Sequence, residues 1–215
     1  MHIDLRPADA GPRAYRLLTN LIVPRPIAWV CSRDAAGGLN LAPFSFFNVM
    51  GSDPPIVVLG VGDESPGKPK HTCRNIAATK EFAINLVTED LAARMNLTAA
   101  DFPEGHSEIA AAGLHPAPST AIETPRLAES KAALECTLHE IQRIGGNNLI
   151  IGRVVSIYLA DAIVDERMHL HGFFPIGRMG SPSWYARTTD RFEIPRITYA
   201  QVRAQETDGA PEIVK

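Results

Sequence analysis

Residues 39–61 read LNLAPFSFFNVMGSDPPIVVLGV, and this stretch decides the fold. It predicts an extended run that is interrupted by a small, polar insert at residues 42–45. A turn over residues 51–55 and an apolar strand over residues 56–61 follow. A strand that breaks beside aromatic residues and then resumes can aim hydroxyl and backbone N–H groups at a flat, anionic ligand. The alternative is a strand kink or a barrel corner, where Pro and small residues are also common.

The composition is that of an ordinary globular protein. The chain has 215 residues, of which 45% are hydrophobic and 21% charged, so residues 1–215 are expected to form one domain. Residues from about 197 to 215 read as a polar C-terminal tail. The net charge of -3 gives no electrostatic case for binding nucleic acid or an anionic membrane surface. No apolar run approaches the roughly 20 residues of a membrane span.

Cysteine usage and the N-terminal sequence favour a cytoplasmic protein. Cys31, Cys73 and Cys136 are far apart and form no C-x-x-C pair, which argues against a disulfide framework and a thiolate zinc site. The N-terminus lacks an apolar signal core, so export is not expected. His169 and His171 alternate along a presumed strand, but a metal site would need further ligands. We therefore expect two polar residues on a barrel rim and no metal.

Hydrophobic periodicity and turn residues predict many strands and a few short helices. Helices are expected at residues 13–21, 70–79 and 88–95, with one helical turn near Ile109. Further strands are expected at residues 27–31, 82–87, 132–144, 148–160 and 168–174, with loops at 62–69 and 175–196. In residues 148–160, paired Ile and Val residues indicate burial on both faces, as at a barrel wall or a subunit contact. The pattern is typical of a mainly β, closed or partly closed barrel.

A second segment that can bind an anion lies at the expected start of the helix over residues 70–79. Free N–H groups and the helix dipole favour an anion at such an end. Lysines there supply countercharge, and Thr72 supplies a hydroxyl or caps the helix. The alternative is an ordinary solvated helix end. The polar residues of this segment are Lys68, Lys70, His71, Thr72, Arg74 and Asn75.

A third candidate is the polar and aromatic stretch at residues 177–187. Its glycines allow close backbone approach, and Arg178 can form two hydrogen bonds with a phosphate. Trp184 and Tyr185 can cover a planar ring. The alternative is an arm in a dimer contact, where Trp, Tyr and Arg are also enriched, and both interpretations can hold together. No G-x-S-x-G, P-loop or G-x-G-x-x-G motif occurs in the chain, so a Rossmann-type nicotinamide site is not supported.

Taken together, these segments resemble the flavin reductase-like family, whose fold is the FMN-binding split β-barrel of Greek-key type. The matching segments follow the family's order and cover most of residues 24–187. The last of them is similar to the flavoredoxin-like branch. The segments are RPIAWVCSRDAAGGLNLAPFSFFNVMGSDPPIVVLGV, KHTCRNI with EFAINLV, NNLIIGRVVSIYL and PIGRMGSPSWYAR.

The resemblance implies non-covalent FMN near the interface of a homodimer, with no catalytic side chain. By position, Val30, Cys31 and Ser32 would edge the isoalloxazine ring. The ring and ribityl chain would contact Asn40, Ala42, Phe44, Ser45 and Phe46. The phosphate would be held by Lys70, Thr72 and Asn75, and Arg178 and Tyr185 would close the pocket. His71 stands where many relatives have Asp, and in its cationic form it would favour phosphate.

The implied function is an FMN-dependent oxidoreductase that passes electrons from NADH, NADPH or a protein donor to an acceptor, with a redox protein or a monooxygenase as candidate partner. One departure concerns the donor. Reductases of two-component monooxygenases often carry Gly-Asp-His before the strand that begins here near Leu149, whereas this chain has Gly146-Asn147-Asn148. That difference favours the alternative of a flavoredoxin-like electron carrier without its own NAD(P)H site. A third interpretation is a binding barrel without flavin.

Overall fold

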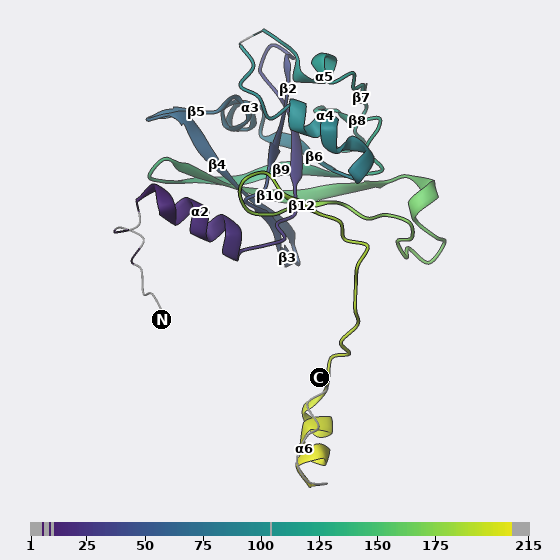
Figure 1. Cartoon of the computed structure of the whole chain (residues 1–215). Coiled ribbons are helices and arrows are strands. Elements are labelled where there is room, and N and C mark those ends of the chain that lie inside the picture. Colours follow the sequence, from purple (N-terminus) through teal and green to yellow (C-terminus); the bar gives the residue numbers. More distant parts are fainter. Residues whose placement is uncertain (1–5, 7–8, 10, 104, 208–215) are drawn as a thin grey trace.

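The computed structural model describes residues 6, 9, 11–103 and 105–207 of the chain (Figure 1). An antiparallel sheet of eight strands curls into a barrel with the order β2-β1-β6-β9-β10-β4-β3, and β5 pairs with β4. The prediction of a mainly β fold with short helices is confirmed. In the described part of the chain, no helix combines the length and apolar character needed to cross a membrane.

Three hairpins and one inserted strand build the barrel. The pairs β1–β2, β3–β4 and β9–β10 are consecutive in sequence, and β6 lies between β1 and β9. The bounds are β1 (Ala28–Arg33), β2 (Leu39–Phe44), β3 (Phe47–Ser52), β4 (Pro55–Ser65), β5 (Lys68–Pro69), β6 (Glu81–Leu86), β9 (Ala132–Ile144) and β10 (Asn147–Leu159). Two short hairpins lie outside this sheet: β7 (Pro116–Ala117) with β8 (Arg126–Leu127), and β11 (Gly177–Arg178) with β12 (Tyr185–Ala186).

The stretch at residues 39–61 breaks later than the sequence predicts. β2 continues through Pro43, which is paired with Trp29, because an edge strand tolerates a residue without an N–H group. The chain leaves one edge strand at Ser45 and enters the other edge strand, β3, after Phe46. The Gly60 N–H donates to the Phe46 carbonyl at 2.7 Å, which ties this crossing to β4. Residues 62–69 form the end of β4 and its pairing with β5, not a loop.

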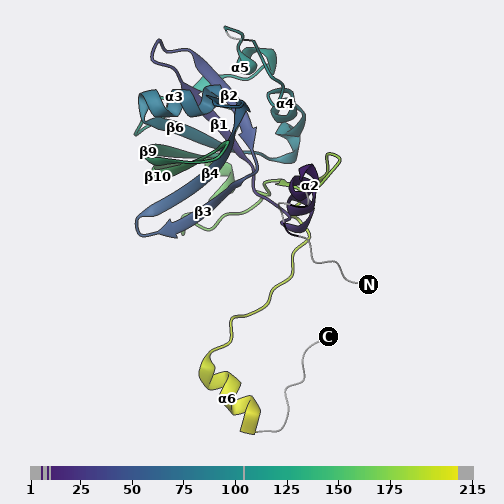
Figure 2. The same cartoon turned by 90° about the vertical axis from the view of Figure 1, so that its left-hand side faces the viewer.

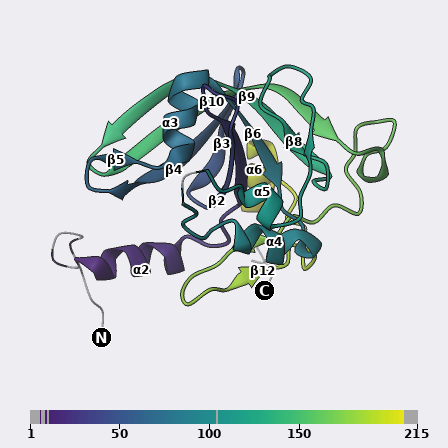
Figure 3. The same ribbon diagram turned by 90° about the horizontal axis from the view of Figure 1, so that it is seen from above.

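Helices lie at the four places where the sequence predicts them, and η2 (Asp161–Ile163) and α6 (Tyr199–Thr207) are additional. The predicted helices are α2 (Pro12–Leu21), α3 (His71–Thr79), η1 (Glu89–Leu91) with α4 (Ala92–Leu97), and α5 (Glu108–Ala111). Figures 2 and 3 show α3 against the strands and α4 and α5 together on one side of the barrel. The buried face of α3 consists of Thr72, Cys73 and Ile76, and Ala77 is exposed.

The C-terminal third departs most from expectation. Residues 168–174 form no strand and make only the isolated bridge between Val164 and Leu170. The expected polar tail contains α6, which Figures 1 and 2 show away from the barrel. On β10, Ile150 is fully buried, but Val155 and Ile157 are exposed. The expected burial of this strand on both faces is therefore not met within a single chain.

The core lies on both faces of β1. Trp29 and Cys31 pack under α4 and α5, while Ala28 and Val30 point into the barrel with Phe82. Trp29 is fully buried, and its Nε1–H donates to Thr98 Oγ1 at 2.9 Å. This hydrogen bond fixes the end of α4 and the residues that follow it against the barrel.

Candidate functional site

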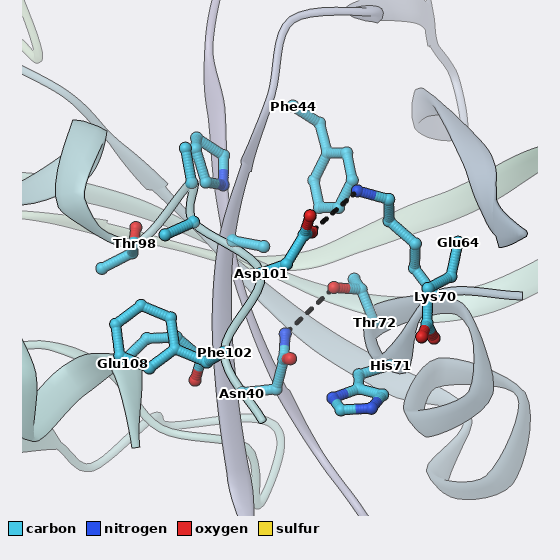
Figure 4. A pocket seen from close by; sticks show the side chains of 14 residues that line it. Asn40, Phe44, Glu64, Lys70, His71, Thr72, Thr98, Asp101, Phe102 and Glu108 are labelled. Atoms are coloured by element: carbon cyan, nitrogen blue, oxygen red, sulfur yellow. Dashed lines mark hydrogen bonds and ion pairs between the residues drawn. The ribbon is translucent and has the colours of Figure 1, made fainter. Parts of the chain in front are cut away.

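A pocket of about 230 Å³ is lined by residues of β2, by Glu64 of β4 and by the start of α3 (Figure 4). We call it the polar pocket. β2 and β4 form one wall, the start of α3 a second, and the segment after α4 together with α5 a third. Its lining residues are Asn40, Ala42, Pro43, Phe44, Glu64, Lys70, His71, Thr72, Thr98, Ala99, Ala100, Asp101, Phe102 and Glu108. Six of the predicted cofactor-binding residues meet here: Asn40, Ala42, Phe44, Lys70, His71 and Thr72.

The start of α3 gives the pocket its anion-binding character. Lys70 is the N-cap residue and makes no side-chain capping hydrogen bond, so Thr72 is not the cap that the sequence suggested. Thr72 is instead the second residue of the helix, and its side chain turns inward to Asn40. N–H groups in the first turn of a helix lack intrahelical partners. Together with the helix dipole they favour a bound anion at this end of α3.

Asn40 links the three walls of the polar pocket. Its side chain lies 3.0 Å from Thr72 Oγ1 (Figure 4). With the amide turned so that every group is satisfied, its oxygen accepts from Thr72 and from the Leu41 N–H at 3.2 Å. Its nitrogen then donates to Glu108 Oε1 at 3.3 Å. Because Asn40 is buried, this satisfied orientation is the one that the cost of an unpaired polar group favours.

Lys70 is the cation of the polar pocket whose ion pair a ligand can most easily replace. Glu64 lies 2.8 Å from Lys68 and 3.7 Å from Arg74, and the hydrogen bond from Lys68 lowers the pKa of Glu64. Lys70 Nζ is 4.0 Å from Asp101, whose side chain is almost fully exposed. Exposed ion pairs of this kind are weak. A ligand anion can therefore take the place of Asp101 beside Lys70.

Glu108 is a site residue that the sequence analysis missed. It is buried, accepts a hydrogen bond from the Leu41 N–H at 3.4 Å, and lines both the polar pocket and a second cavity of about 510 Å³. Burial raises the pKa of Glu108, because the charged carboxylate loses hydration. The available signal was an acidic residue in an apolar helical turn that begins with the capping Ser107.

Four further predicted residues lie near the polar pocket but do not line it. Val30 and Cys31 are fully buried in the core, and burial raises the pKa of Cys31 to about 12. Ser32 is fully buried and accepts from Asn75 Nδ2 at 3.3 Å. Asn75 itself lines the second cavity. Their implied contacts with a ring or a phosphate stay predictions.

The remaining predicted residues gather around Arg25, which the sequence analysis also missed. Arg25 is buried between Pro24 and Pro26 and donates to Ser45 Oγ at 3.3 Å. Its other donors reach the backbone oxygens of Thr19 at 2.6 Å, Ile22 at 2.9 Å and Met179 at 3.0 Å. Burial lowers the pKa of Arg25, and the charge of Arg178 lowers it further.

Arg178 and Phe46 lie at the same end of the molecule as Arg25. The backbones of Arg25 and Arg178 exchange two hydrogen bonds, and Arg178 lies over the Tyr185 ring at 4.9 Å. The Arg25 guanidinium lies 6.0 Å from the centre of the Phe46 ring. Arg25 thereby joins Ser45 to the β11–β12 hairpin. The sequence analysis expected both segments near one ligand but named no residue that connects them.

An apolar groove of about 540 Å³ adjoins this region. Prolines, aliphatic side chains and Phe47 form most of it, and Arg25 is the charged residue among the described residues that line it. The lining residues are Pro24, Arg25, Pro26, Ile27, Phe47, Asn48, Val49, Pro55, Val57, Leu86, Leu134, Val154, Ile157, Pro175, Ile176, Gly177 and Thr188. Phe44 lines the polar pocket and Phe47 lines the apolar groove, so the crossing at residues 45–46 connects the two.

Comparison with known proteins agrees with this architecture. The family described as "Flavin reductase like domain" matches residues 20–205. The chain belongs to this flavin reductase-like family. An uncharacterized protein from Deinococcus radiodurans is 42% identical over 212 residues, which cover 95% of this chain and 93% of that protein.

Solved structures place this flavin reductase-like chain among split-barrel proteins. Nitrilotriacetate monooxygenase component B from Bacillus cereus has a TM-score of 0.85 and 32% identity, covering 90% of this chain and 99% of that one. The Pseudomonas fluorescens 2-nitrobenzoate 2-nitroreductase NbaA has a TM-score of 0.83 and 35% identity, covering 93% and 98%. Flavoredoxin of Desulfovibrio vulgaris (Miyazaki F) shares the fold, with a TM-score of 0.72 and 17% identity over 83% of this chain and 94% of that one.

Among the described residues, no group of three or more His, Cys, Asp or Glu is placed to hold a metal ion.

Proposed function

We propose that this chain binds FMN without a covalent link and acts as a flavin-dependent oxidoreductase. One observation carries the proposal: Asn40 and Phe44 of β2 meet Lys70 and Thr72 at the N-terminus of α3. This is a site for a phosphate next to a surface for an apolar, planar group. The family match supports a flavin as the ligand that carries both groups.

The residues present fit FMN. The Lys70 ammonium and the first-turn N–H groups of α3 would hold the phosphate, with His71 adding charge when protonated. Ala42 and Phe44 would line the ribityl chain and the ring edge. Ser45 Oγ already accepts from Arg25, so its hydroxyl proton is available to a ligand. When bound, FMN supplies the redox chemistry, while the protein supplies position and electrostatics.

Arg25 gives this end of the site a fixed positive charge. The guanidinium is held by backbone oxygens of Thr19, Ile22 and Met179, so it needs no rearrangement to act. A preorganised cation stabilises negative charge that develops on a ligand nearby. We therefore assign Arg25 and Ser45 the role of favouring the anionic, reduced form of the ring.

The electron donor is NADH, NADPH or a redox protein. Asn148, which stands at the place of the His in the Gly-Asp-His segment of many reductases, is buried. It donates to the Val61 carbonyl at 3.1 Å and to Asp63 at 3.0 Å. Its amide thus serves the β4–β10 pairing. This observation favours the second candidate function, an electron carrier that is reduced by a partner protein.

We further propose that the protein works as a homodimer in the cytoplasm, with FMN near the interface. The exposed Val155 and Ile157 on β10 support a subunit contact, and the buried, unpaired cysteines suit a reducing compartment. A monooxygenase is a candidate acceptor, because a similar solved structure is named as component B of a monooxygenase.

Titration with flavins tests the proposal. Purified protein should show a flavin spectrum or bind added FMN tightly, and it should bind riboflavin more weakly because riboflavin lacks the phosphate. A colourless protein that gives no saturable FMN titration would contradict the proposal. Anaerobic mixing with NADH or NADPH then separates the two candidates: rapid bleaching identifies a reductase, and flavin that stays oxidised until a protein donor is added identifies a carrier.

A further inference from the structure

The C-terminal arm, residues 190–198, is exposed and carries three large apolar side chains among charged ones. The exposed fraction of the side chain is 87% for Phe192, 78% for Ile194 and 57% for Ile197. Tyr199, at the start of α6, is 76% exposed. Phe192 and Ile194 are two residues apart in a segment without regular secondary structure. Large apolar side chains clustered on a surface segment mark a contact with another molecule.

The arm starts at the rim of its own apolar groove and then leaves it. Thr188, which lines the groove, donates to the Pro175 carbonyl at 2.9 Å, and Arg191 lies over the Phe174 ring at 5.0 Å. Beyond these contacts, the arm runs away from the barrel in both Figure 1 and Figure 2. Its apolar side chains therefore do not fill the groove from which it departs.

The groove is an incomplete apolar site in the single chain. Val49 and Ile157 line it and are 64% and 62% exposed. The hydrogen bonds of the Arg25 guanidinium go to Ser45 and to backbone oxygens, and the other described residues that line the groove carry no charge. β3 also ends the sheet and has an unpaired edge, where an extended segment can dock.

We infer that the apolar groove receives the C-terminal arm of a second copy of this chain, with Phe192 and Ile194 seated against Val49 and Ile157. This inference rests on the homodimer proposed above. Because the arm begins at the rim of one groove, a two-fold axis beside that rim brings each arm to the other groove. The exchange closes both grooves at once. The exchanged arm also covers residues 45–46 on the side opposite the polar pocket.

Cross-linking tests the exchange directly. The full-length double variant V49C/I194C is treated with a short bis-maleimide, and Val49→Cys and Ile194→Cys are treated separately as controls. The three native cysteines are buried and should not react. A covalent dimer in the double variant, absent from both single variants, is the expected result. An intrachain link, or no link, would overturn the inference.

Light scattering gives the second test. The variant F192D/I194D should shift the wild-type dimer toward monomer by at least tenfold in dissociation constant. Ile144→Asp, at an exposed position that lines none of the described cavities, should leave it unchanged. A double variant that stays as dimeric as wild type overturns the arm's role. FMN binding is measured on the same samples. FMN bound by a monomeric wild type would contradict the homodimer and the arm exchange but not the proposed flavin binding. A cross-linked dimer without FMN affinity would contradict the proposed flavin binding but not the arm exchange.

Discussion

The polar pocket and the apolar groove are built from neighbouring parts of one chain, yet their chemistry is opposite. The polar pocket takes its character from a helix start, a buried amide and charged side chains, including Asn40 and Lys70. The apolar groove is lined by prolines and aliphatic residues, with the donors of Arg25 directed to backbone oxygens and Ser45. The two meet where the chain passes between the edge strands. A split barrel thus offers one end to a charged group and the other to apolar surface.

The largest effect is expected at Arg25, where the two regions are joined. Arg25→Ala removes a buried cation and leaves the carbonyls of Thr19, Ile22 and Met179 without their donor. The free energy of unfolding should fall by about 3 kcal/mol. Urea denaturation measures this, with Arg153→Ala, an exposed position on β10, as the matched control. Equal stability of the two variants would show that Arg25 does not hold the regions together.

Lys70 should have the next largest effect, confined to the polar pocket. Lys70→Met keeps the length of the side chain but removes the charge, so FMN affinity should fall about tenfold to a hundredfold, from the roughly 1.5–3 kcal/mol of a hydrogen bond to a charged group. Riboflavin affinity should not change. Lys68→Met is the control, because Lys68 pairs with Glu64 and does not line the pocket. An equal loss for both flavins would place the phosphate elsewhere.

Glu108 should make stability depend on pH. Its raised pKa means that the folded protein retains a proton that the unfolded chain releases above the ordinary value of 4.5. The stabilisation is complete below 4.5 and is lost as pH rises through the raised pKa. Glu108→Gln cannot lose this proton. The melting temperature of the variant relative to wild type should therefore increase from pH 4 to pH 8, and parallel curves would show that Glu108 titrates normally.

The smallest effect is expected at Arg187, an exposed residue between β12 and the C-terminal arm. Arg187 pairs with Glu89, and both side chains are mostly exposed. Such pairs contribute little because water screens them. Arg187→Ala should leave the melting temperature within error and FMN binding unchanged. A clear loss of either would mean that the β11–β12 segment depends on this ion pair and would weaken the contrast with Arg25.

The sequence predicted those parts of the fold that local patterns encode. The hairpin of β9 and β10 follows from two long apolar runs separated by the turn residues Gly145 and Gly146, and α3 was placed at residues 70–79. Residues 168–174 were wrongly expected to form a strand, because apolar residues there have no neighbouring strand with which to pair. The position of the break at Ser45 also depends on which strands lie at the edges, and a single sequence does not show that order.

The candidate site was predictable where its residues are adjacent in sequence. Lys70, His71 and Thr72 were found from the helix start, although Thr72 turned out to pack inward against Asn40 and not to cap α3. Glu108 and Arg25 were missed, because their roles come from contacts with segments far away in the chain. A buried acid or cation becomes visible only when the groups that surround it are known.

The burial of the three thiols affects how strongly the protein resists oxidation. Cys31, Cys73 and Cys136 are all buried, and burial raises the pKa of each thiol. Peroxide attacks the thiolate form, which is scarce here at neutral pH. A reduced coenzyme that meets dissolved oxygen generates peroxide within a few ångströms of its host. Packing every sulfhydryl in the core protects this chain from the by-product of its own proposed chemistry.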